Sequence, residues 1–157
     1  MLIPLTNSDL CAEVDDEFAD VVLAHKWRSR TQKRFGDRIT SVYTKPLGCR
    51  SGVLTMHHLV HGKPPPGMVT DHIDGDPLNN KLANLRHCTN AQNQWNARGR
   101  ASTSGFKGVR VYRSGWRGQI RANGKTHYSN MFHSARDAAL WVMQKRAELH
   151  GSFARHF

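Results

Sequence analysis

The spacing of apolar positions changes along the chain and predicts different elements in different segments. Up to about residue 98, apolar residues recur at helical spacing in some segments and alternate with polar residues in others. The expected helices cover residues 15–26, 53–62 and 90–98, and the expected strands cover 27–34, 38–45, 69–74 and 85–89. Three acidic residues begin the first helix and Lys26 ends it, which complements the helix dipole. This mixture predicts an α+β fold.

A more regular pattern follows residue 105. Three short runs alternate polar and apolar residues, over 108–112, 116–122 and 126–132, and turn-forming Ser-Gly and Asn-Gly pairs separate them. Ser134, followed three residues later by Asp137, is a capping pattern at the start of a helix with an apolar stripe. The C-terminal module is therefore expected to be a three-stranded antiparallel sheet packed on one helix.

The composition between residues 98 and 105 separates these two parts. The segment reads Arg-Gly-Arg-Ala-Ser-Thr-Ser-Gly, which is typical of a flexible, basic linker. The expected domains are an N-terminal α+β cap (1–50), a central core (51–98), a linker (99–105) and a C-terminal domain (106–157). A chain of 157 residues leaves each of these modules small.

The charge of the chain is strongly positive and unevenly distributed. It has 23 lysines and arginines against 12 aspartates and glutamates, a formal net charge of +11. Residues 1–50 carry 8 basic and 7 acidic side chains, residues 51–97 carry 3 and 3, and residues 98–157 carry 12 and 2, so the balance is +1, 0 and +10. A cationic module joined to a neutral body predicts a polyanionic partner for the C-terminal part.

Other patterns exclude several classes of protein. The longest apolar stretch, residues 21–24, is far shorter than a membrane span, and the N-terminus has no signal-peptide pattern, so we expect a cytoplasmic protein without a membrane partner. Cys11, Cys49 and Cys88 are odd in number and widely separated, which is consistent with reduced thiols and not with a zinc clip.

The most informative segment is residues 71–76, which read Asp-His-Ile-Asp-Gly-Asp. A histidine at a strand end can accept a proton from water while a neighbouring carboxylate holds a divalent cation. Asp71 and His72 can act together only if the strand ends or bends there, because adjacent strand residues point to opposite faces. Asn93, on the following helix, can add a neutral oxygen ligand, and such a set suits magnesium.

These residues resemble the HNH endonucleases of the ββα-metal type, and most closely the small phage and intron-encoded homing endonucleases. Asn84 stands twelve residues after His72, and Asn93 nine residues after Asn84. Residues 54–98 also carry the runs Asp-His-Ile-Asp-Gly, Leu-Asn-Asn and Asn-Leu-Arg. The resemblance implies that the central core is a ββα-metal nuclease domain.

The same resemblance implies a role for each of four residues. His72 would be the general base that activates water, Asp71 and Asn93 would bind one Mg²⁺ or Mn²⁺, and Asn84 would hold the loop or orient His72. The metal would stabilise the phosphate and the leaving 3′ oxygen. Asn93 in place of a histidine favours a hard cation over zinc, and the chain lacks the four cysteines of members with structural zinc.

Two other interpretations of this region are weaker. Residues 74–76 read Asp-Gly-Asp, as in a calcium loop, but the twelfth position of that loop is Leu85, where an EF-hand needs a glutamate. His57 and His61 stand four apart, as in a zinc-protease helix, without the glutamate that acts as base there. We therefore expect a structural or phosphate-contacting role for this histidine group.

The middle strand of the C-terminal module separates polar from apolar residues by face. Arg117, Gln119 and Arg121 point to one side, and the residues between them point toward the helix. Arginine forks suit guanine edges and phosphates, and a sheet ribbon fits the major groove. The residues expected to contact DNA are Lys107, Arg110, Tyr112, Arg113, Arg117, Gln119, Arg121 and Tyr128.

This module is similar to the APETALA/ethylene-response-factor DNA-binding domain, which occurs in plant regulators and appended to phage HNH proteins. The matching runs are Lys-Gly-Val-Arg at 107–110 and Trp-Arg-Gly-Gln-Ile-Arg at 116–121, within residues 105–151. Gln119 stands where plant members often have an acid, and Ser-Asn-Met at 129–131 replaces a Leu-Gly-Thr run. The base preference of the plant proteins therefore does not transfer.

Together these features predict a metal-dependent endonuclease for duplex DNA, in which the neutral part cuts and the cationic sheet binds. One metal site per chain fits a monomeric nicking enzyme or a double-strand cutter that acts in successive steps. A non-catalytic DNA-binding regulator and a nuclease for RNA or single strands are the alternatives. A phage or mobile-element origin rests on the resemblance.

Overall fold

The structure is a computed structural model that describes residues 1–32, 38–45, 52–97 and 103–155. The chain divides into two compact units, Met1–Asn90 and Ala91–Phe157. Both mix short helices with small antiparallel sheets, so the expected α+β class is confirmed. No helix among the described residues has the length and apolar character needed to cross a membrane.

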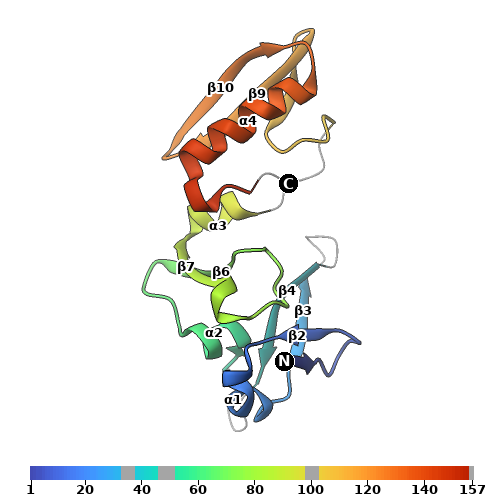
Figure 1. Ribbon diagram of the computed structural model, residues 1–157, viewed down its shortest axis with the longest axis vertical. Helices are drawn as coiled ribbons and strands as arrows, with labels where there is room; N and C mark the ends of the chain where they lie inside the picture. Colours follow the sequence, from blue (N-terminus) through green and yellow to red (C-terminus); the bar gives the residue numbers. More distant parts are fainter. Residues whose placement is uncertain (33–37, 46–51, 98–102, 156–157) are drawn as a thin grey trace. The chain divides into compact units, whose positions relative to one another are not determined.

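The first unit contains three small antiparallel sheets and two short helices (Figure 1). Its elements are β1 (Leu2–Pro4), β2 (Cys11–Glu13), α1 (Ala19–Leu23), β3 (Arg28–Gln32), β4 (Arg38–Thr44), β5 (Leu54–Thr55), α2 (Met56–His61), β6 (Met68–His72) and β7 (Leu85–Thr89). The sheets are β1–β2, β3–β4–β5 and β6–β7. Short 3₁₀ turns at Asp16–Phe18 and Leu82–Asn84 precede α1 and β7.

A single apolar core joins the N-terminal cap to the central segment in this unit. Trp27, Val42 and Met56 are almost completely buried in it, together with Val22 and Leu85. The Trp27 indole N–H donates to the Val22 carbonyl at 2.8 Å, which satisfies the one polar atom of this large side chain. The expected packing of residues 1–50 against the segment with the Asp-His motif is therefore present.

Two of the expected helices have different boundaries in the structure. The helix expected over 15–26 is limited to a 3₁₀ turn and α1, because the chain turns so that Trp27 enters the core. The helix expected over 53–62 begins only at Met56, because Leu54 and Thr55 pair with β4 as β5. The turn expected at 35–37 and Cys49 lie outside the described residues. Among the cysteines that the structure describes, Cys11 is exposed and Cys88 is buried, and neither forms a disulfide.

The second unit is a three-stranded sheet with one long helix across it. Its elements are α3 (Asn90–Asn96, of which Asn90 itself belongs to the first unit), β8 (Val109–Tyr112), β9 (Gly115–Ala122), β10 (Lys125–Phe132) and α4 (Ala135–His150). The strand order is β10–β9–β8, all antiparallel, and α4 lies along one face (Figure 1). This is the architecture expected for the C-terminal module.

Residue types at defined positions explain how α4 packs on this sheet. Ser134 accepts a hydrogen bond from the Asp137 amide at 3.1 Å, which confirms the predicted cap. Gly118 lies at the centre of β9, and a Cβ there would come within 2.6 Å of Trp141 and 2.8 Å of Val142. Glycine therefore allows the helix to approach, and Val109 and Ile120 complete the core beneath it.

Candidate functional site

The local fold places His72 at the end of a strand. β6 ends at His72, and the amide of Gly75 donates to the His72 carbonyl at 2.8 Å. Gly75 has a φ of 67°, a left-handed conformation that glycine adopts without steric cost and that closes the turn. The strand expected over 69–74 is therefore shorter, and it ends where the predicted chemistry required it to end.

Asp71 is held by an arginine on the neighbouring strand. Its carboxylate is only 5% exposed, and Arg86 stands directly opposite it in the β6–β7 register. The Arg86 Nε and Nη2 atoms both lie 2.9 Å from Asp71 Oδ2. An ionised carboxylate offers about four lone-pair sites, so this ion pair is compatible with the predicted role of Asp71 as a cation ligand.

The His72 ring is oriented by a buried asparagine that the sequence did not single out. His72 Nε2 lies 3.3 Å from Oδ1 of Asn80, whose side chain is completely buried. Asn80 Nδ2 donates to the carbonyls of Pro77 at 3.1 Å and Leu78 at 3.2 Å. Because these bonds fix the amide orientation, Oδ1 is the acceptor and His72 Nε2 carries the proton. The lone pair of the neutral ring then lies on Nδ1.

Burial also favours the neutral form of His72. Desolvation lowers the pKa of His72, although the hydrogen bond to Asn80 and the carboxylates of Asp74, Asp71 and Asp76 oppose the shift. A neutral imidazole at neutral pH is the form that can accept a proton from water. The geometry and the charge state therefore both suit a general base.

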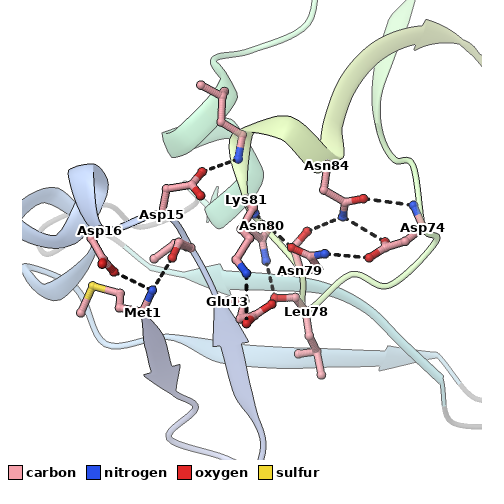
Figure 2. A network of polar contacts seen from close by, with 12 residues as sticks. Met1, Glu13, Asp15, Asp16, Asp74, Leu78, Asn79, Asn80, Lys81 and Asn84 are labelled. Carbon is pink, nitrogen blue, oxygen red and sulfur yellow. Dashed lines mark hydrogen bonds and ion pairs between the residues drawn. The ribbon is translucent and has the colours of Figure 1, made fainter.

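Asn84 holds the loop that follows the strand, one of its two predicted roles. Asn84 Nδ2 donates to Asp74 Oδ1 at 2.9 Å and to the Asn79 carbonyl at 2.8 Å, while its Oδ1 accepts from the Asp74 amide at 3.1 Å. Figure 2 shows the Asn84 and Asn79 side chains converging on Asp74. Burial raises the pKa of Asp74, but hydrogen bonds from Asp76, Asn84 and Asn79 outweigh it and lower the pKa overall.

The N-terminal cap supplies further partners for this loop, a role that the sequence did not reveal. The Glu13 amide donates to the Leu78 carbonyl, and the Asn80 amide donates to the Glu13 carbonyl, both at 2.8 Å. The Leu82 amide donates to Asp15 at 2.7 Å, and Lys81 forms an ion pair with Glu13 (Figure 2). β2 thus helps to fix the segment that contains Asn80.

The histidines of α2 lie close to His72 and β7. The His57 and His72 rings meet edge to face with centroids 5.5 Å apart, and His61 Nδ1 lies 3.0 Å from His87 Nε2. Burial, with the neighbouring His58 and His72, lowers the pKa of His57 to about 3. A buried, neutral imidazole fits the structural alternative for His57 better than a phosphate contact.

The predicted metal ligands lie in different units of the chain. Asp71 belongs to β6 in the first unit, whereas Asn93 lies on α3 in the second. Within the described ranges, no group of three or more histidines, cysteines, aspartates or glutamates is arranged to hold a metal ion. A carboxylate and an amide, completed by water, suit magnesium, but the share of Asn93 in such a site stays a prediction.

The exposed face of the second sheet is cationic and aromatic, as expected. The Arg117 guanidinium lies over the Tyr112 ring at 4.6 Å and the Tyr128 ring at 4.4 Å, and Arg117 Nε donates to the Ser129 carbonyl at 3.2 Å. The guanidinium of Arg113 lies 5.4 Å from the centre of the Tyr112 ring.

A pocket of about 560 Å³ lies between the segment 103–111 and β9. Arg110, Gln119 and Arg121 line it. Together with Arg117, they make a surface that can bind a polyanion.

Lys107 is placed differently from the other residues expected to contact DNA. Its ammonium donates to the backbone carbonyl of Trp95 at 3.0 Å and to that of Ala97. Burial, with the nearby Arg146 and Arg155, lowers the pKa of Lys107 to about 8. The Lys107 ammonium therefore makes its contacts within the second unit, and Lys107 is not proposed as a DNA contact.

Comparison with known proteins finds a family match for the central segment and two viral relatives. Residues 55–95 match the family described as HNH endonuclease. The chain is 41% identical over 98 residues to protein 3.8 of Escherichia phage T7, covering 60% of this chain and 80% of that protein. It is 31% identical over 115 residues to an uncharacterized HNH endonuclease of Acanthamoeba polyphaga mimivirus, covering 69% of this chain and 60% of that protein.

No solved structure matches the chain significantly. The matched segment nevertheless includes all four residues of the candidate site, and the phage protein is aligned over most of its length. The chain therefore contains an HNH endonuclease domain over residues 55–95, and members of this family act on nucleic acid and typically depend on a metal ion.

Proposed function

We propose that this protein is a metal-dependent endonuclease that hydrolyses phosphodiester bonds in duplex DNA, as a homing-type or nicking enzyme. The observation that supports it most directly is the state of His72. The ring stands at a strand end, Asn80 fixes its Nε2 proton, and burial keeps it neutral. These are the requirements for a histidine that removes a proton from an attacking water.

In this mechanism His72 Nδ1 accepts the proton of a water molecule as that water attacks phosphorus. Asn80 keeps the ring in the required tautomer, and Asn84 keeps the loop after the strand in one conformation. The fixed ring avoids a reorganisation cost at the moment of reaction. The cut leaves a 5′-phosphate and a 3′-hydroxyl end.

Asp71 and Asn93 are the residues that would hold one Mg²⁺ or Mn²⁺. When bound, the cation would stabilise the charge on the phosphate and on the leaving 3′ oxygen. Arg86 keeps the Asp71 carboxylate in place through its two contacts with Oδ2. The ligand set has hard oxygen donors, which suit these two cations.

The second unit would bind the duplex through the exposed face of its sheet. This face carries Arg110, Arg117, Gln119 and Arg121 with Tyr112 and Tyr128, and α4 covers the opposite face. Arg113 lies in the turn after β8, near the Tyr112 ring. The similarity to the APETALA/ethylene-response-factor domain supports the same assignment. Because residues 98–157 carry +10 of the total +11, binding should weaken steeply as salt increases.

The direct test is cutting of supercoiled plasmid by the wild type, His72→Ala and His133→Ala, with Mg²⁺, Mn²⁺ or EDTA. His133 is an exposed histidine of the second unit and serves as the matched control. We expect His72→Ala to cut about 10²- to 10⁴-fold more slowly with plasmid binding unchanged, and His133→Ala to match the wild type. Equal cutting by His72→Ala, or cutting that persists in EDTA, would overturn the mechanism.

The same assay separates the alternative substrates. Duplex, single-stranded DNA and RNA of one sequence are offered at equal concentration. The proposal expects the duplex to be cut fastest, because the cationic sheet would bind its groove and both backbones. Preferential cutting of RNA or single strands would replace the substrate assignment, and binding without cutting of any of them would indicate a DNA-binding regulator.

A further inference from the structure

α3 carries Asn93 but is too short to be stable on its own. It has seven residues, with no acidic side chain in its first turn and no basic side chain in its last turn. Helices shorter than about 12 residues are marginal in water, and these charges would have complemented the helix dipole. Contacts from elsewhere in the chain must therefore keep α3 helical.

Lys107 provides the first of these contacts, from the far side of the segment that joins α3 to β8. Its ammonium binds the carbonyls of Trp95 and Ala97 at the C-terminal end of α3, and it lies 3.4 Å from the Arg155 carbonyl. The last carbonyls of a helix lack partners within the helix and carry partial negative charge. Lys107 supplies both a donor and a positive charge at that end.

Trp95 provides the second contact, by stacking on the last residue of α4. The Trp95 and His150 rings are parallel within 1°, with centroids 4.2 Å apart. His150 is 8% exposed, and its Nε2 lies 3.1 Å from the Arg121 carbonyl, so Nε2 donates to that oxygen. Arg121 belongs to β9, the central strand of the cationic sheet. A short series of contacts thus connects this strand to α3.

Arg146, a residue of α4, holds the backbone at Lys107 and Arg155. Its side chain is 3% exposed, Nη2 donates to the Lys107 carbonyl at 3.1 Å, and Nη1 donates to the Arg155 carbonyl at 3.1 Å. A buried guanidinium with defined acceptors has little freedom to move. The backbone on both sides of the Lys107 ammonium is therefore held in place by α4.

We propose that Trp95, Lys107 and His150 form a clamp that holds α3 on the cationic unit and so positions Asn93 as a metal ligand. This inference rests on the proposed function, because it takes from that function the role of Asn93. The three residues act through Asn93 and are positioning residues. Because the clamp consists of contacts within the second unit, the affinity for the metal ion would depend on the same unit that is proposed to bind DNA.

The test compares two variants that open the clamp with two matched variants that do not. Lys107→Met removes the cap and Trp95→Leu removes the stacking ring. Lys125→Met removes the same charge from an exposed position of the same unit, and Trp95→Phe keeps a ring at the stacking position. For each protein we would measure hydrogen exchange of the amides of residues 93–97, the Mn²⁺ concentration at half-maximal cutting, and affinity for duplex DNA in EDTA.

We expect Lys107→Met and Trp95→Leu to lose protection of these amides and to need about 10- to 100-fold more Mn²⁺, the usual effect of removing a residue that orients a metal ligand. Their DNA affinity in EDTA should match that of Lys125→Met, and Trp95→Phe should stay close to the wild type. Circular dichroism checks folding. If Lys107→Met does not fold, Lys107→Arg, which keeps a cation, is compared with the two Trp95 variants.

Three outcomes would contradict the clamp. Unchanged exchange at residues 93–97 in both variants would show that these contacts do not hold α3. Lost protection with an unchanged Mn²⁺ requirement would show that the clamp holds α3 but that this contact does not position Asn93 as a metal ligand. Reduced DNA affinity of Lys107→Met alone would make Lys107 a DNA contact. If the wild type neither cuts nor binds Mn²⁺, the proposed function fails, while the exchange data still decide whether the clamp exists.

Discussion

The two units of this protein use polar residues in opposite ways. In the first unit, buried or half-buried polar side chains bond to one another and to the backbone, as Asn80 and Asn84 do around His72. In the second, an apolar core lies under α4, and Arg110, Arg117 and Arg121 lie on the opposite face of the sheet. Catalysis needs groups fixed in position, whereas binding a polyanion needs accessible charge, and under the proposed function the two units would separate these requirements.

The distribution of charge follows from this difference. The formal charges of the first 97 residues sum to +1, and those of residues 98–157 sum to +10. A neutral site leaves the positive charge at the phosphate to a bound cation, and the strongly basic sheet would bring the DNA. The comparison predicts that substitutions around His72 in the first unit impair cutting and that substitutions on the exposed face of the second unit's sheet impair binding.

After His72→Ala, the largest effect is expected from Asn80→Ala in the first unit. The substitution removes the Asn80 amide that donates to the Pro77 and Leu78 carbonyls and removes the hydrogen bond between Asn80 and His72. We expect a loss of about 1–3 kcal/mol in the free energy of unfolding and at least a tenfold slower rate of cutting, measured by urea denaturation and plasmid nicking. Asn130→Ala, at an exposed position, is the control. Wild-type cutting by Asn80→Ala would show that the tautomer of His72 is set in another way.

Arg117→Ala should produce the complementary defect in the second unit. Arg117 stands between Tyr112 and Tyr128, and its loss should weaken duplex binding by about tenfold, with the rate at saturating DNA unchanged. Fluorescence anisotropy over a salt series measures the affinity and the slope of log affinity against log salt concentration. A slope whose magnitude is smaller by about one than that of the wild type would identify a phosphate contact. Arg136→Ala, at an exposed position on α4, is the control. A slower rate at saturating DNA would contradict the division between the units.

Acid should destabilise the first unit through its histidines. The folded-state pKa of His57 is about 3, below the ordinary value of 6.5, so the unfolded chain binds more protons between these values. His58 on α2 and His72 at the end of β6 face His57, and their pKa values are also lowered. The free energy of unfolding should therefore fall as pH decreases from about 6.5 toward 3. Fluorescence of Trp27 would follow this loss of stability. His57→Gln should make the free energy of unfolding depend less steeply on pH. An unchanged dependence would assign the loss of stability to other groups.

The smallest effect is expected from Ser134→Ala at the start of α4. The substitution removes the cap to the Asp137 amide and should lower the free energy of unfolding of the second unit by about 1 kcal/mol. Thermal unfolding measures the change, with Ser114→Ala, an exposed turn residue, as the control. DNA affinity at low temperature should be unchanged, because α4 lies on the face opposite the arginines. Weaker binding at that temperature would implicate the helix itself.

Much of the fold was predictable because its signals are local. Alternation in three runs placed β8, β9 and β10, and the Ser134 capping pattern placed the start of α4. The spacing of Asp71, His72, Asn84 and Asn93 led to the nuclease family, which the comparisons support. Boundaries were less predictable where tertiary packing intervened, as at Trp27, whose burial ends the first helix early.

The sequence by itself determined the class of fold, the order of the elements and the candidate residues, because periodicity, turn chemistry and motif spacing are properties of neighbouring residues. Only the tertiary structure decided that Asn80 orients His72, that β2 supports the loop, and that Lys107 binds the end of α3. No rule of sequence spacing predicts these contacts, because folding alone brings the residues that they join together. Hydrogen bonds and ring stacking depend on distances of a few ångströms, which the folded core sets.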